Sequence, residues 1–164
     1  MELKVGANSE ARLKAALNLR RLSGVLVAIT QLPSPMLPLL GLHHVAIICS
    51  DYAASKRFYT EILGLEVLAE THRAARDSYK LDLAVNGRYA LELFSFPTPP
   101  PRPSYPEAAG LRHLAFAVAD VAAAIRHLTQ HGVACEPSRT DELTGRRFTF
   151  FADPDGLPLE FYEA

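Results

Sequence analysis

Two histidines and two glutamates recur in this chain at nearly the same separation, and together they could bind a metal ion. His44 precedes Glu92 by 48 residues, and His113 precedes Glu160 by 47. Imidazole nitrogens and carboxylate oxygens are donors that divalent Ni, Co, Zn, Mn and Fe ions accept in proteins. Water would complete the five or six ligands of such an ion. The spacing therefore predicts one divalent metal ion, of the types just named, held by His44, Glu92, His113 and Glu160.

Each of these four residues lies in a segment whose pattern is typical of a β-strand. Side chains alternate across a strand, so His44 shares a face with Ala46, and His113 shares a face with Ala115. The small alanines leave room beside each imidazole. A single histidine or glutamate on a strand is more often a half-buried or exposed structural residue. A carboxylate between apolar neighbours is costly to bury unless it is paired, however, and the repetition favours the metal site.

The two pairs belong to an internal repeat. In both copies an aspartate follows the histidine by seven positions, a helix-like stretch ends at Gly64 or Gly132, and a late Leu-Glu is followed by aromatic residues. Helices are expected over 53–63 and 121–131, with Asp51 and Asp120 as N-caps. Strands are expected over 42–49, 65–72, 78–85 and 88–95, and again over 111–118, 133–136, 147–151 and 157–162.

The predicted fold class is α+β, with two tandem βαβββ modules. Module one covers 40–96 and module two covers 107–164. The linker 97–106 holds six prolines, which lack an amide donor and cannot continue a central strand or a helix. Residues 1–39 are interpreted as an N-terminal extension that is poorly ordered or partly helical, with an amphipathic helix conceivable over 9–22.

Composition excludes several classes of function. Hydrophobic residues make up 49% of the chain, charged residues 21%, and the formal net charge is −1. No global basic field would recruit nucleic acid or an anionic membrane, and no apolar run is long enough to span a bilayer. Cys49 and Cys135 form no C-x-x-C motif and no disulfide framework, which favours a reducing, cytoplasmic setting.

Several of these motifs resemble the vicinal oxygen chelate (VOC) superfamily. They are His-x-Ala-Ile-x-x-x-Asp from His44, Phe58-Tyr59, Leu63-Gly64, Asp153-Pro154-Asp155-Gly156 and Leu159-Glu160. The similarity covers about residues 40–164 and is closest to small bacterial proteins of the glyoxalase, bleomycin-resistance and dioxygenase type. This resemblance implies an open eight-stranded half-barrel, formed by the two modules around the metal site.

The ligand set His-Glu-His-Glu resembles that of bacterial glyoxalase I. It implies a metal-dependent lyase or isomerase, similar to lactoylglutathione lyase, that acts on a small α-oxygenated substrate through a metal-stabilised enediolate. Glu160 would carry the proton, with Glu92 as its counterpart, so both are the expected catalytic residues. Ile48 and Phe96 stand where glyoxalase I has an arginine and an asparagine, which leaves the use of glutathione open.

Other functions remain open on the sequence alone. The chain could be another VOC enzyme, an epimerase or an Fe-dependent dioxygenase, or a non-catalytic protein that sequesters a ligand and confers resistance. The expected partner is a small-molecule substrate, without nucleic acid, a membrane or an organic cofactor. Because members of the superfamily often form dimers that share the site, a homodimer is also expected.

Overall fold

The computed structural model of the protein describes residues 17–22, 25–30, 37–104, 106 and 108–164. The chain divides into two compact units, Met1–Gly41 and Leu42–Ala164. Within these described ranges, no helix is both long and apolar enough to cross a membrane.

The described residues of the first unit include two paired strands. Strand β1 (Leu17–Leu22) pairs antiparallel with β2 (Val25–Thr30). The helix considered over 9–22 is therefore wrong for residues 17–22, while its earlier residues lie outside the described part. The second strand is rich in β-branched residues, which favour an extended backbone and give β1 a pairing partner.

The second unit contains two four-stranded sheets with the same connectivity. In the first module β3 (Val45–Cys49), β4 (Glu66–Arg73), β5 (Ser78–Val85) and β6 (Arg88–Ser95) form a sheet of order β3-β6-β5-β4. In the second module β7 (Leu114–Val118), β8 (Arg139–Thr140), β9 (Arg147–Ala152) and β10 (Pro158–Glu163) form the order β7-β10-β9-β8. The predicted α+β fold of two βαβββ modules, with open sheets, is confirmed.

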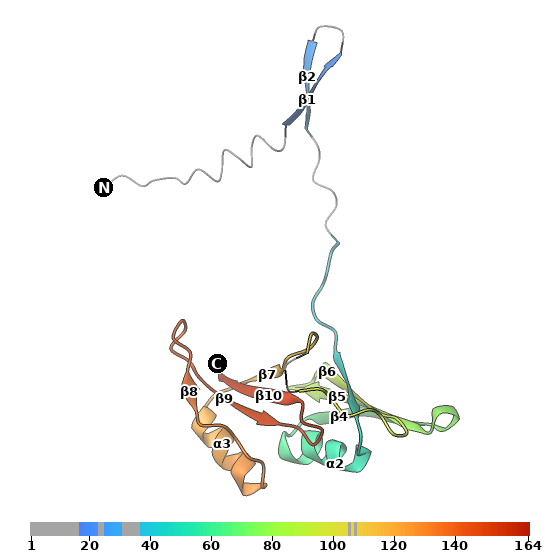
Figure 1. Ribbon diagram of the computed structural model, residues 1–164, viewed down its shortest axis with the longest axis vertical. Helices are drawn as coiled ribbons and strands as arrows, with labels where there is room; N and C mark the ends of the chain where they lie inside the picture. The colour runs from blue at the N-terminus through green and yellow to red at the C-terminus, as the bar shows by residue number, and fades with distance from the viewer. Residues whose placement is uncertain (1–16, 23–24, 31–36, 105, 107) are drawn as a thin grey trace. The chain divides into compact units, whose positions relative to one another are not determined.

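A helix connects the first two strands of each module. The first is α2 (Tyr52–Arg57), which continues into the π-helical turn η1 (Phe58–Ile62), and the second is α3 (Val121–Gln130). A short 3₁₀ turn, η2 (Ala74–Arg76), joins β4 to β5. The predicted N-caps are confirmed, because the side chains of Asp51 and Asp120 accept hydrogen bonds from the amides of Ala54 and Ala123. Both helices lie on the same side of the strands in Figure 1.

The two modules share one hydrophobic core. Phe58 and Tyr59 of the first helix pack in the same buried cluster as Leu128, Phe151 and Leu159 of the second module. The π-helical turn places the neighbouring residues Phe58 and Tyr59 both inside the core, which a regular α-helix does less readily because consecutive side chains diverge by about 100°. Ala54 of the same helix is exposed.

A polar tie also joins the modules inside this core. The hydroxyl of Tyr59 donates a hydrogen bond of 2.9 Å to Asp153 Oδ2, and neither residue is more than 6% exposed. Asp153 Oδ1 accepts the amides of Asp155 and Leu157 at 2.9 and 2.8 Å. The Asp-Pro-Asp-Gly segment therefore forms a turn, and its first aspartate anchors the helix of the other module.

One predicted strand is largely wrong. In place of a strand over 133–136, Cys135 makes an isolated bridge to Phe151, and the short strand β8 lies further on. Pro137 lacks an amide donor, so it interrupts the ladder between these two points. Strands β3 and β7 also begin three residues later than predicted, immediately after His44 and His113.

Candidate metal centre

The first histidine–glutamate pair lies at the start of the sheet of module one. His44 directly precedes β3, and Glu92 lies in β6 opposite Ala46 of β3. The parallel pairing of these strands brings His44 Nε2 to 3.2 Å from Glu92 Oε2. Ala46 is exposed on the face that it shares with His44, so the small side chain leaves this side of the sheet open, as predicted.

The second pair has the same geometry in module two. His113 directly precedes β7, and Glu160 of β10 lies opposite Ala115 of β7. His113 Nε2 is 3.2 Å from Glu160 Oε2. The internal repeat in the sequence therefore corresponds to a repeated pair of possible metal donors.

Both pairs fit a divalent metal ion. Two donor atoms bound at right angles to one cation, with bonds of about 2.1 Å, lie about 3 Å apart. The distance of 3.2 Å between Nε2 and Oε2 in each pair is close to that separation. Each pair supplies one imidazole nitrogen and one carboxylate oxygen, the mixed donor set that first-row divalent ions accept.

The two pairs do not meet in this single chain. Among the residues that the structure describes, no group of three or more His, Cys, Asp or Glu side chains lies close enough together to hold a metal ion. Each module therefore presents half of the predicted ligand set, and the complete set of four stays a prediction.

Glu92 is held by two further side chains. Lys80 Nζ lies 2.8 Å from Glu92 Oε1 and 2.6 Å from Asp82 Oδ1. Tyr89 also donates a hydrogen bond to Glu92 Oε1. Lys80, followed by Tyr89, holds the pKa of Glu92 below its usual value. One carboxylate oxygen is thus fixed by donors, while Oε2 faces His44.

Glu160 has a different environment. It lies opposite Phe150 of β9, where the equivalent neighbour of Glu92 is Asp82 of β5. The ring of Phe150 also meets the ring of His113 edge-on, with the centroids 5.1 Å apart. Among the described residues, the Glu160 side chain makes its polar contact with His113. The two carboxylates therefore have unequal freedom, since Glu92 is anchored and Glu160 is not.

Lys80, Asp82 and Tyr89 were not among the predicted site residues. A signal was present, because Lys80 and Asp82 alternate within an otherwise apolar strand and must share one face of it. His43 is exposed, with its Nδ1 2.8 Å from that of His44.

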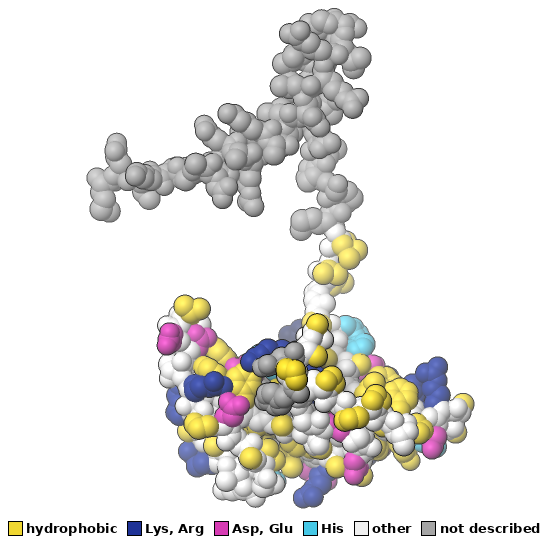
Figure 2. Space-filling view, in the orientation of Figure 1, with side chains coloured by type: hydrophobic (Ala, Val, Ile, Leu, Met, Phe, Trp, Pro, Cys, Tyr) yellow, Lys and Arg dark blue, Asp and Glu magenta, His cyan; other side chains and the backbone are white. Residues whose placement is uncertain are grey.

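Charge is mixed on the face of residues 42–164 that Figure 2 shows. Figure 2 shows basic and acidic side chains scattered over the visible face of residues 42–164, without a continuous field of one sign. This agrees with the net charge of −1 and gives no footprint for a polyanion on that face.

Comparison with known proteins places this arrangement in a family context. The family model described as the glyoxalase/bleomycin resistance protein/dioxygenase superfamily matches residues 41–161. The uncharacterized protein YaeR of Escherichia coli (strain K12) is 62% identical over 128 residues, which cover 78% of this chain and 99% of that protein. The 2-epi-5-epi-valiolone epimerase of an Actinomyces species is 32% identical over 142 residues, covering 74% of this chain and 78% of that enzyme.

Solved structures show the same fold. A glyoxalase family protein from Enterococcus faecalis is 52% identical and superimposes with a TM-score of 0.70 over 76% of this chain and 98% of that one. The trypanothione-dependent glyoxalase I of Leishmania major is 26% identical, with a TM-score of 0.56 over 74% of this chain and 84% of that one.

Proposed function

The chain belongs to the glyoxalase/bleomycin resistance protein/dioxygenase superfamily, and on that premise we propose that it is a metal-dependent lyase or isomerase of the glyoxalase I type. Its substrate would be a small molecule with oxygen atoms on adjacent carbons. The observation that carries this proposal is the pair of matched histidine–glutamate contacts, each with Nε2 and Oε2 3.2 Å apart.

His44, Glu92, His113 and Glu160 would hold the metal ion. When bound, a divalent ion supplies Lewis-acid polarisation of the substrate oxygens. Glu92 is suited to the part of a fixed ligand, because Lys80 and Tyr89 hold its Oε1 while Oε2 faces His44.

Glu160 is suited to proton transfer. It would take a proton from one substrate carbon and return it to the adjacent carbon, so that the net reaction is an isomerisation that needs no oxidant or reductant. Its environment supports this role. Among the described residues its side chain makes a polar contact with His113, and the neighbouring Phe150 offers no hydrogen bond. A carboxylate that transfers a proton has to move, and the ion pair with Lys80 would hold Glu92 in place.

A second copy of the chain is the proposed source of the other half of each site. The two pairs lie apart in one chain, and the sheet face that carries His44 leaves Ile48 56% exposed. An isologous dimer could bring His44 and Glu92 of one protomer to His113 and Glu160 of its partner, and could cover this apolar face. Sedimentation velocity tests this, with a monomer at micromolar concentration as the contrary result.

Metal content is the first test of the proposed function. Tag-free protein is purified without chelator, loaded separately with Ni, Co, Mn, Fe and Zn ions, and analysed by mass spectrometry. We expect about one tightly bound ion per chain, and His113→Ala should lose most of that affinity. Stoichiometric metal in His113→Ala would contradict the ligand assignment.

Solvent-proton exchange tests the role of Glu160. Metal-loaded protein is incubated in D₂O with hemithioacetals of methylglyoxal, formed from glutathione or from 2-mercaptoethanol, and the product is examined by NMR. Glu160→Gln should lower the rate of hemithioacetal conversion at least 100-fold. Its metal content should nevertheless exceed that of His113→Ala. An equal rate in Glu160→Gln would remove Glu160 from the mechanism.

Epimerisation is the second candidate, favoured by the 32% identity to 2-epi-5-epi-valiolone epimerase. It also moves a proton at a carbon beside a carbonyl, so the same glutamate could serve it. Exchange at a single carbon with inversion, and without conversion of hemithioacetals, would favour this function. Turnover that depends on Fe²⁺ and O₂ would instead indicate a dioxygenase.

A further inference from the structure

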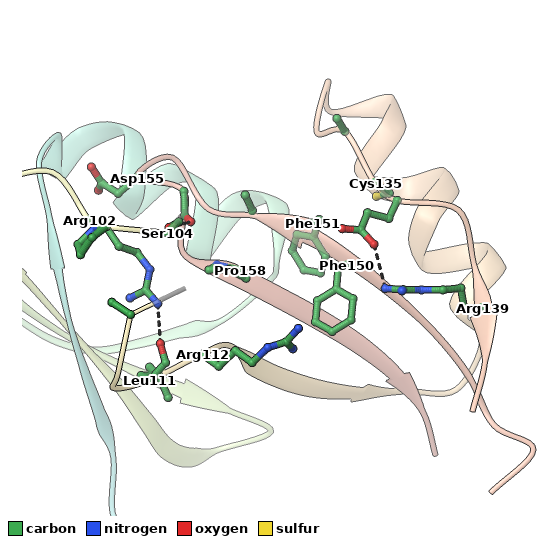
Figure 3. A pocket seen from close by; sticks show the side chains of 16 residues that line it. Arg102, Ser104, Leu111, Arg112, Cys135, Arg139, Phe150, Phe151, Asp155 and Pro158 are labelled. Atoms are coloured by element: carbon green, nitrogen blue, oxygen red, sulfur yellow. Dashed lines mark hydrogen bonds and ion pairs between the residues drawn. The ribbon is translucent and has the colours of Figure 1, made fainter. Parts of the chain in front are cut away.

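A cavity of about 780 Å³ opens on module two, beside the second histidine–glutamate pair. It lies between the proline-rich linker, which contributes Arg102 and Ser104, and the strand β9, which contributes Phe150 (Figure 3). Phe150 is the residue that pairs with Glu160 across the β9–β10 ladder. The cavity therefore lies on the face of the sheet that carries the Glu160 side chain.

Basic side chains dominate the charge of this cavity. Arg102, Arg112 and Arg139 line it, against the carboxylates of Glu136 and Asp155. Asp155 is already engaged, because its two oxygens accept hydrogen bonds from the amide and the hydroxyl of Ser50. Hydrogen bonds from these neutral donors do not remove the charge of Asp155, so three guanidinium groups face two carboxylates and the cavity carries an excess of one positive charge.

The other carboxylate, that of Glu136, forms only a weak ion pair with Arg139. Glu136 lies 2.9 Å from Arg139, but the two side chains are 53% and 52% exposed. Ion pairs this open to water contribute little to stability. A ligand with a more concentrated negative charge could therefore displace Glu136 from the guanidinium at small cost.

Two of the arginines converge on one ring. The guanidinium carbon of Arg139 lies 5.4 Å from the centroid of Phe150, and that of Arg112 lies 5.8 Å from it. Figure 3 shows both side chains pointing toward Phe150. Both guanidinium carbons lie within 5.8 Å of one ring centroid, so an anion bound beside that ring would be attracted by both. Planar guanidinium groups bind carboxylates and phosphates through paired hydrogen bonds.

Arg112 connects this cavity to the candidate metal ligand. Its Nη1 lies 3.1 Å from His113 Nδ1, so in this arrangement the guanidinium donates and Nδ1 accepts. A metal ion at Nε2, the nitrogen that faces Glu160, requires the proton of a neutral imidazole to be on Nδ1. An Nδ1–H cannot accept from a guanidinium. Metal binding would thus release Nη1 of Arg112, in addition to the guanidinium donors that the contact with His113 leaves free.

We propose that Arg112 and Arg139 form a subsite for an anionic group of the substrate, a carboxylate or a phosphate, next to the reacting end held by His113 and Glu160. The inference rests on the proposed function for the position of the reacting atoms, but the anion subsite itself needs no metal ion. It narrows the substrate class to small α-oxygenated molecules that carry a negative charge at one end.

Calorimetry on the full-length chain tests the subsite. Inorganic phosphate and succinate are titrated separately into metal-free protein and into Zn-loaded protein. We expect saturable binding of at least one of the two anions, with one site per chain. Phosphate binding alone would identify a phosphate-bearing substrate, succinate binding alone a carboxylate-bearing one, and absence of saturable binding of both would overturn the proposal.

Matched variants locate the binding. Arg139→Gln and Arg112→Gln should each raise the dissociation constant about tenfold or more, the loss expected for a hydrogen bond to a charged group. Arg126→Gln is the control, because it removes the same charge from the exposed side of α3. Its dissociation constant should stay within about twofold of the original value, allowing for long-range screening. Equal affinities in Arg139→Gln and Arg126→Gln would mean adventitious surface binding and would overturn the proposal.

The outcomes separate this inference from the proposed function. Metal content is measured on the same Arg139→Gln preparation, where it should match the unsubstituted protein. Anion binding that depends on Arg139 in a chain that takes up no metal would support the subsite and refute the metalloenzyme. Full metal uptake with no anion binding would refute the subsite and support the metalloenzyme.

Discussion

Replacing Tyr59 by phenylalanine should destabilise the protein by about 1.5–3 kcal/mol at neutral pH, the range for a lost hydrogen bond to a charged group. The phenol is fully buried and donates at 2.9 Å to Asp153 Oδ2, and Asp153 is itself only 6% exposed. Removing the hydroxyl leaves that oxygen buried without this donor. The backbone amides of Asp155 and Leu157 still bind Oδ1, so the loss is confined to one bond.

Urea denaturation followed by circular dichroism measures the change. Tyr52→Phe is the matched control, because Tyr52 also donates to a carboxylate, that of Glu70 at 2.7 Å, but in an exposed position. We expect Tyr52→Phe to cost less than about 1 kcal/mol, as exposed polar pairs do. A Tyr59→Phe protein as stable as Tyr52→Phe would refute the reasoning that this hydrogen bond joins the modules.

The pH dependence gives a second check on the same bond. Burial raises the pKa of Asp153, while hydrogen bonds, including that from Tyr59, act to lower it. The phenol therefore stabilises the ionised carboxylate more than the protonated carboxyl group. The difference in unfolding free energy between the original protein and Tyr59→Phe should be full above the pKa of Asp153 in the folded state and should shrink as the pH falls through it.

Three other perturbations follow from the structure. Cys49 is 1% exposed, and burial raises its pKa to about 11. Iodoacetamide at pH 8 should therefore label Cys135 first, and equal labelling rates of the two cysteines by mass spectrometry would contradict this. Gly132 has φ 76°, so Gly132→Ala should cost about 1 kcal/mol in urea denaturation, with an unchanged midpoint as the contrary result. Lys80→Met should lower the free energy of unfolding by about 0.5–1 kcal/mol at pH 7. Because Lys80 lowers the pKa of Glu92, this loss should become smaller as the pH drops below the usual pKa range of glutamate. A loss that grows at low pH would contradict the reasoning.

Much of the fold could be predicted because strand periodicity is a local property. Strands β5 and β6 have the predicted bounds, 78–85 and 88–95, since alternation within the segment and a turn at Asn86-Gly87 define them. The π-helical turn could not be predicted from a 3.6-residue repeat, because it arises where Phe58 and Tyr59 both enter the shared core.

The candidate site shows the same limit. Parallel pairing of β3 with β6 and of β7 with β10 follows from the module pattern, and this pairing alone brings each histidine to its glutamate. Whether the two pairs meet depends on how two sheets are placed relative to each other, and the spacing of residues within one sheet carries no such information. The lysine beside Glu92 was likewise overlooked, because its two partners, Asp82 and Glu92, lie on two different strands.

The distribution of the two pairs over one chain also bears on inheritance. If a second copy completes each centre, a chain with His44→Ala and a chain with His113→Ala would assemble into a mixed dimer. One of its centres would contain both damaged halves, and the other would contain both intact halves. Two inactive alleles expressed together would then restore activity that neither provides alone, and the single gene would behave as two complementing units.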